Sequence, residues 1–147
     1  MIDRLRDPAV REFVEAARIG HLATASSAGA PHNIPLCFWF DGARFYFVID
    51  EKPKRATGTG IKRMKNIAEN PRVALVIDHY EENWQQLGYV LIHGIARMVE
   101  DEAEYADAIQ HLRHKYSQYH AMMLTREKNP LVRIEPQRIH TWGQRFQ

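Results

Sequence analysis

The chain has 147 residues, of which 45% are hydrophobic and 26% are charged. This composition is typical of a soluble globular protein and excludes disordered and fibrous chains. The formal net charge is only +2, which argues against a dedicated RNA- or DNA-binding protein. The length suits one hydrophobic core, so we expect residues 1–147 to form a single domain.

Cysteine content and the first residues bear on the cellular compartment. The single cysteine, Cys37, excludes an intramolecular disulfide and suits a reducing environment. The opening residues, MIDRLRDPAV, are charged and lack the apolar centre of a signal peptide. Apolar runs are all shorter than the ~18 residues that a membrane span needs. We therefore expect a cytoplasmic protein with no membrane partner.

The first 50 residues predict one helix and three antiparallel strands. The helix is expected over 7–20 and the strands over 21–26, 32–40 and 43–50. Asp7 is a candidate N-cap, with Pro8 at the first helical position. Pro35 inside the second strand indicates an edge strand or a bulge, because proline cannot donate a ladder hydrogen bond. Asp41 and Gly42 predict a hairpin with a type I′ turn.

The remaining residues predict two helices and three strands. The helices are expected over 61–70 and 100–119, and the strands over 72–78, 89–100 and 131–142. The first of these helices must end before Pro71, because the residue before a proline avoids helical geometry. Gly94 inside a strand indicates a bulge or a close backbone approach. Pro136 predicts a kink in the last strand.

These elements give the order α-β-β-β-α-β-β-α-β, with six mainly antiparallel strands. An open sheet of this size would leave two exposed edges, and closure into a barrel removes them. The predicted fold is therefore mainly β, of the α+β kind: a six-stranded antiparallel barrel with flanking helices.

Cations gather in one part of the chain. Six lysines and arginines lie between Asp50 and Lys65, against two acids. Lys62 and Arg63 begin a helix after a flexible loop, where free backbone N–H groups and the helix dipole favour a phosphate. The alternative is a solvated helix face, on which Lys62, Arg63, Lys65 and Asn66 lie opposite the apolar residues.

Other common catalytic patterns are missing from the sequence. It contains no nucleophile elbow, metalloprotease helix, EF-hand loop or complete Walker motif. His111 and His114 share a helix face, but no cluster of cysteines or carboxylates completes a metal site, so we expect none. No side chain identifies itself as a catalytic acid or base.

Beyond these patterns, long stretches of the chain resemble a known family. The segments ATASSAGAPHNIPLCFWFDGARFYFVID, IKRMKNIAENPRVALVID and YVLIHGIARMVE are similar to the pyridoxamine 5′-phosphate oxidase-like split β-barrel superfamily. The most specific match is a basic pair, Lys62 and Arg63, followed by Ile67, Asn70, Pro71 and Val73. Within the superfamily the chain is more similar to the branch that uses the deazaflavin coenzyme F-420.

The resemblance implies a homodimer with two flavin-type cofactors bound in clefts at the subunit interface. It makes Lys62 and Arg63 the ligands of the cofactor phosphate. The resemblance implies further cofactor contacts, which rest on strand alignment and not on an identical motif. They are Asn33, Ile34, Pro35 and Leu36 on the second strand, Val48, Ile49 and Asp50 on the third, and Trp84 or Tyr89 from the other subunit. Relative to the oxidase, the chain has an insertion between Asp50 and Ile61, whose Lys52, Lys54 and Arg55 suit the long anionic tail of coenzyme F-420.

The resemblance also implies an oxidoreductase. Reduced coenzyme F-420 would donate a hydride to an electron-poor small molecule, such as one with a conjugated C=C bond. Trp39, Trp84, Tyr89 and Trp142 are candidates for the pocket wall, with core packing as the alternative. Three other functions stay open: an FMN-dependent oxidoreductase related to the oxidase, a carrier that binds flavin, coenzyme F-420 or haem without turnover, and a small nucleic-acid-binding barrel, which the weak charge disfavours.

Overall fold

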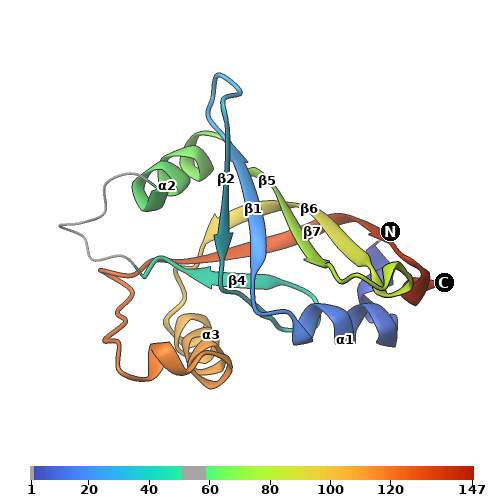
Figure 1. Ribbon diagram of the computed structural model, residues 1–147. Helices are drawn as coiled ribbons and strands as arrows, with labels where there is room; N and C mark the ends of the chain where they lie inside the picture. Colours follow the sequence, from blue (N-terminus) through green and yellow to red (C-terminus); the bar gives the residue numbers. More distant parts are fainter. Residues whose placement is uncertain (1, 51–58) are drawn as a thin grey trace.

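One curled antiparallel sheet dominates the computed structural model, which describes residues 2–50 and 59–147 (Figure 1). Its strands are β1 (Gly20–Ala25), β2 (Pro31–Leu36), β3 (Trp39–Phe40), β4 (Phe45–Val48), β5 (Arg72–His79), β6 (Gly88–Met98) and β7 (Leu131–Trp142). Neighbours follow the order β2-β1-β5-β6-β7-β4-β3. The sheet curls into a half-barrel, and the predicted mainly β fold with flanking helices is confirmed.

The sheet has seven strands where six were predicted, because the strand expected over 32–40 is broken. β2 pairs with β1, whereas β3 pairs with β4. At the break, the Phe38 backbone bonds to a side chain. Its N–H donates to the Tyr116 hydroxyl oxygen at 3.1 Å, and that hydroxyl lies 3.1 Å from the Phe38 carbonyl. Pro35 lies on an edge strand, as predicted.

The hairpin at Asp41 is confirmed, but its predicted turn type is wrong. Phe40 pairs with Phe45, and the Asp41 N–H donates to the Arg44 carbonyl at 3.0 Å. A type I′ turn needs positive φ at both central residues. Gly42 has a φ of 103°, whereas no described non-glycine residue has a positive φ. The Asp41 carboxylate stabilises the turn instead, by accepting from the backbone N–H groups of Ala43 and Arg44.

Gly94 produces the predicted irregularity in the long β6–β7 pair. The register shifts between His93 and Gly94, so that Gln137 has no partner on β6. A Cβ atom on Gly94 would lie only 2.6 Å from the Glu135 carbonyl oxygen. Both predicted features, a bulge and a close backbone approach, are therefore present.

The helices start where the capping signals place them. α1 (Pro8–Ala16) is capped by the Asp7 carboxylate, which accepts from the Ala9 N–H at 2.9 Å. It ends before the predicted boundary at Gly20, which is the first residue of β1. α2 (Thr59–Glu69) stops before Pro71, as expected.

α3 (Glu102–Lys115) is shorter than predicted, and a 3-10 turn, η4 (Ser117–His120), follows it. Further 3-10 turns in the described ranges are η1 (Ile2–Arg6), η3 (Trp84–Gln86) and η5 (Gln144–Phe146). In the described part of the chain, no helix is long and apolar enough to cross a membrane.

Two hydrophobic clusters hold these elements together. The larger one joins α1 to the sheet and includes Phe13 of α1 with Leu22, Phe45 and Ile92 of the strands. The smaller one lies between α3 and the strands β4 and β7, around Leu112. α2 packs on β1 and β2, at the end of the sheet away from both chain termini (Figure 1). This arrangement leaves two ends of the sheet that differ in their side chains.

Candidate functional site

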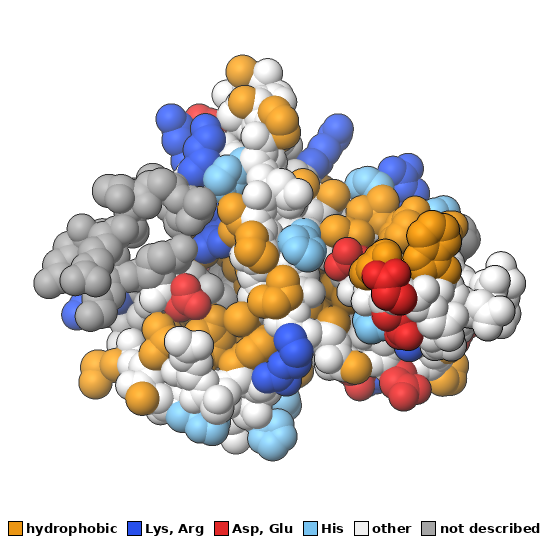
Figure 2. Space-filling view, in the orientation of Figure 1, with side chains coloured by type: hydrophobic (Ala, Val, Ile, Leu, Met, Phe, Trp, Pro, Cys, Tyr) orange, Lys and Arg blue, Asp and Glu red, His pale blue; other side chains and the backbone are white. Residues whose placement is uncertain are grey.

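The predicted phosphate-binding pair lies in the first half of α2. The helix begins at Thr59, so the free N–H groups of its first turn precede Lys62 and Arg63. Lys62 is half-buried, while Arg63 is only 5% exposed, with its guanidinium 5.6 Å from the centroid of the Phe47 ring. Lys65 is exposed. Figure 2 shows Lys and Arg side chains gathered on this end of the molecule. Of the three cations on this helix, Lys65 is solvated, Lys62 is half-buried and Arg63 is held inside.

A group of buried polar side chains adjoins Arg63. Four polar or charged residues are buried in the described ranges, and three of them, Thr24, Arg63 and Asn66, lie on α2 and the neighbouring strand β1. The Asn66 amide nitrogen donates to the Thr24 hydroxyl at 3.0 Å. Thr24 lies opposite His32 in the β1–β2 pair. The alternative interpretation, a solvated helix face, therefore does not hold for Arg63 and Asn66.

Two atoms of this group are buried without a hydrogen-bond partner among the described residues: Asn66 Oδ1 and His32 Nε2. An unsatisfied buried polar atom costs about 1–3 kcal/mol, so such atoms often mark places where a ligand or water binds. Sequence reasoning missed this group. The available signal was the three-residue spacing of Arg63 and Asn66, which puts both on one helix face.

Residues predicted as contacts on β2 divide between the two faces of the sheet. Ile34 and Leu36 are buried in the large core cluster. Asn33 and Pro35 alternate with them and are exposed. Because side chains alternate along a strand, only Asn33 and Pro35 present their side chains on the outer face.

The end of β4 is fixed by residues that follow α3. The Tyr119 hydroxyl donates to Asp50 Oδ2 at 2.8 Å, and burial, together with this carboxylate, raises the pKa of Tyr119. The Ile49 N–H donates to the Pro130 carbonyl at 2.8 Å, and the Ile49 carbonyl accepts from the Asn129 amide at 3.1 Å. This part of the chain is thus held rigidly before the segment that leads to α2.

The other predicted contacts at this strand end serve different roles or cannot be placed. Val48 is buried in the smaller cluster and Ile49 in the larger one, so both side chains serve packing. Lys54 and Arg55 lie outside the described residues.

Trp84 and Tyr89 lie at the opposite end of the sheet. β5 has eight residues and runs from just after α2 toward η3, a span of roughly 25 Å at the usual strand rise. Within one chain, these two aromatics are therefore not brought together with Lys62 and Arg63. Their predicted role as contacts from a second subunit stays a prediction.

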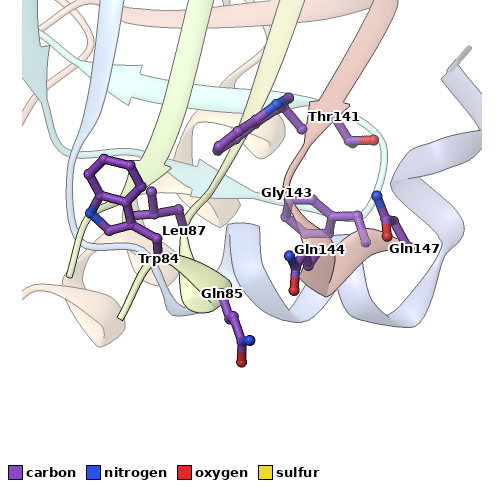
Figure 3. Close-up of a pocket in the computed structure, with 9 residues that line it drawn as sticks. Trp84, Gln85, Leu87, Thr141, Gly143, Gln144 and Gln147 are labelled. Atoms are coloured by element: carbon purple, nitrogen blue, oxygen red, sulfur yellow. The ribbon is translucent and has the colours of Figure 1, made fainter. Parts of the chain in front are cut away.

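A cavity of about 460 Å³ lies at this end, between η3 and the segment that ends β7 (Figure 3). Trp84 and Leu87 lie on one side of it, with Thr141, Gln144 and Gln147 on the other. Trp142 also lines the cavity, and its ring stacks on Tyr89 with the centroids 5.7 Å apart. Three of the four predicted wall aromatics thus gather here.

Trp39, the fourth predicted wall aromatic, lies elsewhere. It stacks on His111 with ring centroids 4.1 Å apart and on Tyr46 at 5.3 Å. In the ranges that the structure describes, no three His, Cys, Asp or Glu side chains form a group that could hold a metal ion.

With this geometry in place, comparison with known proteins gives the family. The model of the pyridoxamine 5′-phosphate oxidase family matches residues 7–143. The chain belongs to this family. A curated relative, the 5a,11a-dehydrotetracycline/5a,11a-dehydrooxytetracycline reductase of Streptomyces rimosus, is 28% identical over 137 residues, which cover 89% of this chain and 78% of the relative.

Proteins with solved structures of the same fold are named for different functions. An F-420 reductase is 22% identical with a TM-score of 0.61, over 88% of this chain and 94% of that one. The haem storage protein HutZ of Vibrio cholerae is 16% identical with a TM-score of 0.69, over 93% of both chains. At these identities the likeness concerns the fold alone.

Proposed function

We propose that this protein is a reductase that uses coenzyme F-420 to reduce an electron-poor small molecule. The observation that carries this proposal is the pairing of Lys62 with the buried Arg63 early in α2, in a chain of this family. A guanidinium binds phosphate oxygens through paired N–H donors, and a neighbouring ammonium adds a second positive charge.

The side chains around α2 fit the phosphate end of a flavin-type cofactor. Lys62 and Arg63 supply two positive charges, and the first turn of α2 supplies N–H donors. The unpartnered atoms His32 Nε2 and Asn66 Oδ1 add hydrogen-bonding capacity on the neighbouring β2 and on α2 itself. In this proposal Lys62 and Arg63 bind the phosphate, and Asn33 and Pro35 contact the cofactor along β2.

A C=C bond conjugated with a carbonyl group is the proposed acceptor. By its name, the Streptomyces relative reduces dehydrotetracyclines, and hydride transfer to such a bond is a reaction that a reduced deazaflavin can supply when bound. The hydride brings two electrons to the electron-poor carbon, and a proton from solvent completes the reduction at its neighbour. This chain would contribute binding and orientation, because no described side chain is placed as an obvious acid or base.

Coenzyme F-420 is preferred to FMN on the basis of charge. The segment between Asp50 and Thr59 carries Lys52, Lys54 and Arg55 in the sequence, and coenzyme F-420 has an anionic tail beyond its phosphate for these cations to bind. FMN ends at the phosphate. An FMN-dependent reaction is the second candidate, and haem binding without turnover is a third, favoured by the fold shared with the haem storage protein.

We also propose that the protein is a cytoplasmic homodimer whose cofactor clefts lie between the subunits. Trp84 and Tyr89, which lie far from α2 in their own chain, would then face the cofactor of the other subunit. Size measurement by light scattering tests this arrangement, and a monomer that still binds the cofactor tightly would contradict it.

The phosphate assignment is tested by replacing the basic pair. We expect Lys62→Ala combined with Arg63→Ala to weaken cofactor binding tenfold or more, because two charges and their hydrogen bonds are lost. Lys65→Ala removes an exposed cation from the same helix and is the matched control, with affinity expected within about twofold of the wild type because exposed charges contribute little. If the double variant and the control bind the cofactor equally well, Lys62 and Arg63 do not bind its phosphate.

A further inference from the structure

The cavity between η3 and η5 has a floor of tightly packed backbone. Gly143 has a φ of 128°, and a Cβ atom there would lie 2.4 Å from the Leu87 carbonyl oxygen. A Cβ on Gly88 would meet the Trp142 carbonyl oxygen at 3.3 Å. At Gly143 both the positive φ and the close approach require glycine, whereas a Cβ on Gly88 would only crowd the opposite segment. The floor is therefore a built part of the fold.

Contacts with the N-terminal elements hold this floor in place. Phe146 of η5 packs edge-to-face on Phe13 of α1, with ring centroids 5.1 Å apart. The Arg4 guanidinium donates to the Phe146 carbonyl and to the Thr141 hydroxyl, both at 3.1 Å. The Arg145 guanidinium donates to the Gln86 carbonyl at 3.2 Å, which ties η5 to η3. The two sides of the cavity are thus joined beneath it.

Two exposed indole rings line the cavity. Trp84 is 69% exposed and Trp142 is 50% exposed. Stacking on Tyr89, with an angle of 17° between the rings, sets the orientation of Trp142. An exposed tryptophan leaves a large apolar surface in water, and two of them around one cavity mark a binding surface. Fixed aromatic rings favour a flat ligand that can stack on them.

The polar groups of the lining are uncharged. Beside its apolar side chains, the cavity is lined by the amides of Gln85, Gln144 and Gln147 and by the Thr141 hydroxyl, with no ionisable side chain. Amides donate to and accept from carbonyl and hydroxyl groups. An anionic ligand would lose water here without gaining a counter-charge from these side chains. The volume, about 460 Å³, lies within the usual range of small-molecule sites.

From this lining we infer that the cavity binds an uncharged, planar, fused-ring compound with ring carbonyl or hydroxyl groups. That the cavity is the site of the hydride acceptor rests on the proposed function. That it binds such a ring system is independent of the proposed function. The phosphate-bearing cofactor is matched by the cations on α2, at the other end of β5. The ligand stacks on Trp84 and Trp142, and the glutamine amides bind its oxygen atoms.

Binding is measured on the protein without cofactor, by the quenching of tryptophan fluorescence. The probes are 1,8-dihydroxyanthraquinone and, as a charged partner with the same rings, anthraquinone-2-sulfonate. Trp39→Phe serves as the background, because Trp39 lies outside the cavity and phenylalanine preserves ring packing against His111 and Tyr46. We expect this background to bind the uncharged probe at least tenfold more tightly than the sulfonate.

In the same background, Trp84→Ala and Trp142→Ala are each expected to weaken binding of the uncharged probe at least fivefold. Trp84 is mostly exposed, so its removal should leave the fold intact, and an unchanged circular dichroism spectrum and melting temperature would check this. Unchanged affinity in Trp84→Ala, or equal affinity for the two probes, would overturn the inference. So would a wild-type protein that binds neither probe, whatever its oligomeric state.

Failure of this inference is distinguishable from failure of the proposed function. Cofactor affinity is measured separately, with the variants of Lys62 and Arg63, and needs no fused-ring probe. If the protein binds coenzyme F-420 but no anthraquinone, the proposed function stands and the ring-binding role of the cavity fails. If it binds the anthraquinone but not coenzyme F-420, the cavity binds rings and the proposed function fails.

Discussion

The two ends of the sheet differ in charge and in the way the chain builds them. The α2 end has Lys62 at its surface and Arg63, Asn66 and Thr24 inside. The opposite end has a cavity without ionisable side chains, between exposed indole rings. One end suits a phosphate and the other an uncharged ring. We propose that the two ends bind chemically different groups, a phosphate at the first and an uncharged ring system at the second.

Their construction differs as well. The cationic pair and its buried neighbour Asn66 come from one helix, so a short motif encodes them. The cavity is assembled from η3 and from residues after β7, which are far apart in sequence. The first end is thus sensitive to single side chains, and the second to the backbone that joins its two segments.

Gly143→Ala should break the aromatic end and leave the cationic end intact. Its Cβ would clash with the Leu87 carbonyl, and the residue would keep an unfavourable positive φ. We expect the free energy of unfolding to fall by about 3 kcal/mol, from backbone strain and overpacking together. Urea unfolding measures this loss. Probe binding should be lost, while cofactor affinity should fall less than in the double variant of Lys62 and Arg63. An unchanged urea midpoint would show that the floor is not packed as described.

Asn66→Ala should act on the other end. It removes a fully buried amide and its hydrogen bond to Thr24. We expect a loss of about 1–2 kcal/mol in unfolding free energy, as for other buried hydrogen bonds with a small cavity term, and weaker cofactor binding. The exposed Asn33→Ala is the matched control for stability, with a change within about 0.5 kcal/mol. If the two variants lose equal stability, Asn66 has no structural role.

Tyr119→Phe sharpens the comparison by loosening the strand end that precedes α2. It removes the donor to Asp50 and leaves a half-buried carboxylate with one bond fewer. We expect about 1 kcal/mol of lost stability and a few-fold weaker cofactor binding, without effect on the anthraquinone probe. Tyr105→Phe removes a hydroxyl bonded to the Asn129 carbonyl at 2.8 Å on the same side of the molecule, and should cost similar stability. A matching loss of cofactor affinity in Tyr105→Phe would mean that the effect is not specific to Asp50.

Lys115 is a cation outside both ends, and its titration should change stability with pH. Burial lowers its pKa to about 8, although its amine donates to the Phe38 carbonyl at 3.0 Å. Between pH 8 and the ordinary lysine pKa near 10.4, the unfolded chain keeps a proton that the folded protein has lost. Stability should therefore rise with pH in this range, relative to Lys115→Met.

Thermal melts of the wild type and Lys115→Met at pH 7 and pH 9.5 check the direction. Burial raises the pKa of Tyr116 to about 12, so above pH 10 the folded state retains a proton that the unfolded state releases, and stability falls. The measurement for Lys115 must stay below that range. A stability difference between the two proteins that does not change with pH would show that Lys115 titrates normally.

Periodicity and glycine or proline positions predicted most of the sheet. The bulge at Gly94 and the edge position of Pro35 follow from single residues whose backbone limits are strong. The break at Phe38 could not be predicted, because it depends on the hydroxyl of Tyr116, which is 78 residues away. The turn at Asp41 was assigned a wrong type, because the side chain of Asp41 bonds to the backbone and replaces the geometry that Asp-Gly usually adopts.

The same division holds for the candidate sites. Lys62 and Arg63 could be found because they lie in one contiguous motif. The burial of Arg63 and Asn66 was missed, because charge and amide groups usually indicate a solvent-facing side, and only tertiary packing against β1 reverses this. Trp39 lies apart from the other three candidate aromatics, and nothing in its local sequence indicates its stacking with His111.

The central claim, that this chain holds coenzyme F-420 through the cations of α2, is tested most directly by titrating the wild-type protein with coenzyme F-420 and with FMN. We expect coenzyme F-420 to bind in the micromolar range or tighter, at least severalfold more tightly than FMN, because its longer anionic tail meets more positive charge. Tighter binding of FMN, or a haem Soret band with no binding of either cofactor, would contradict the account.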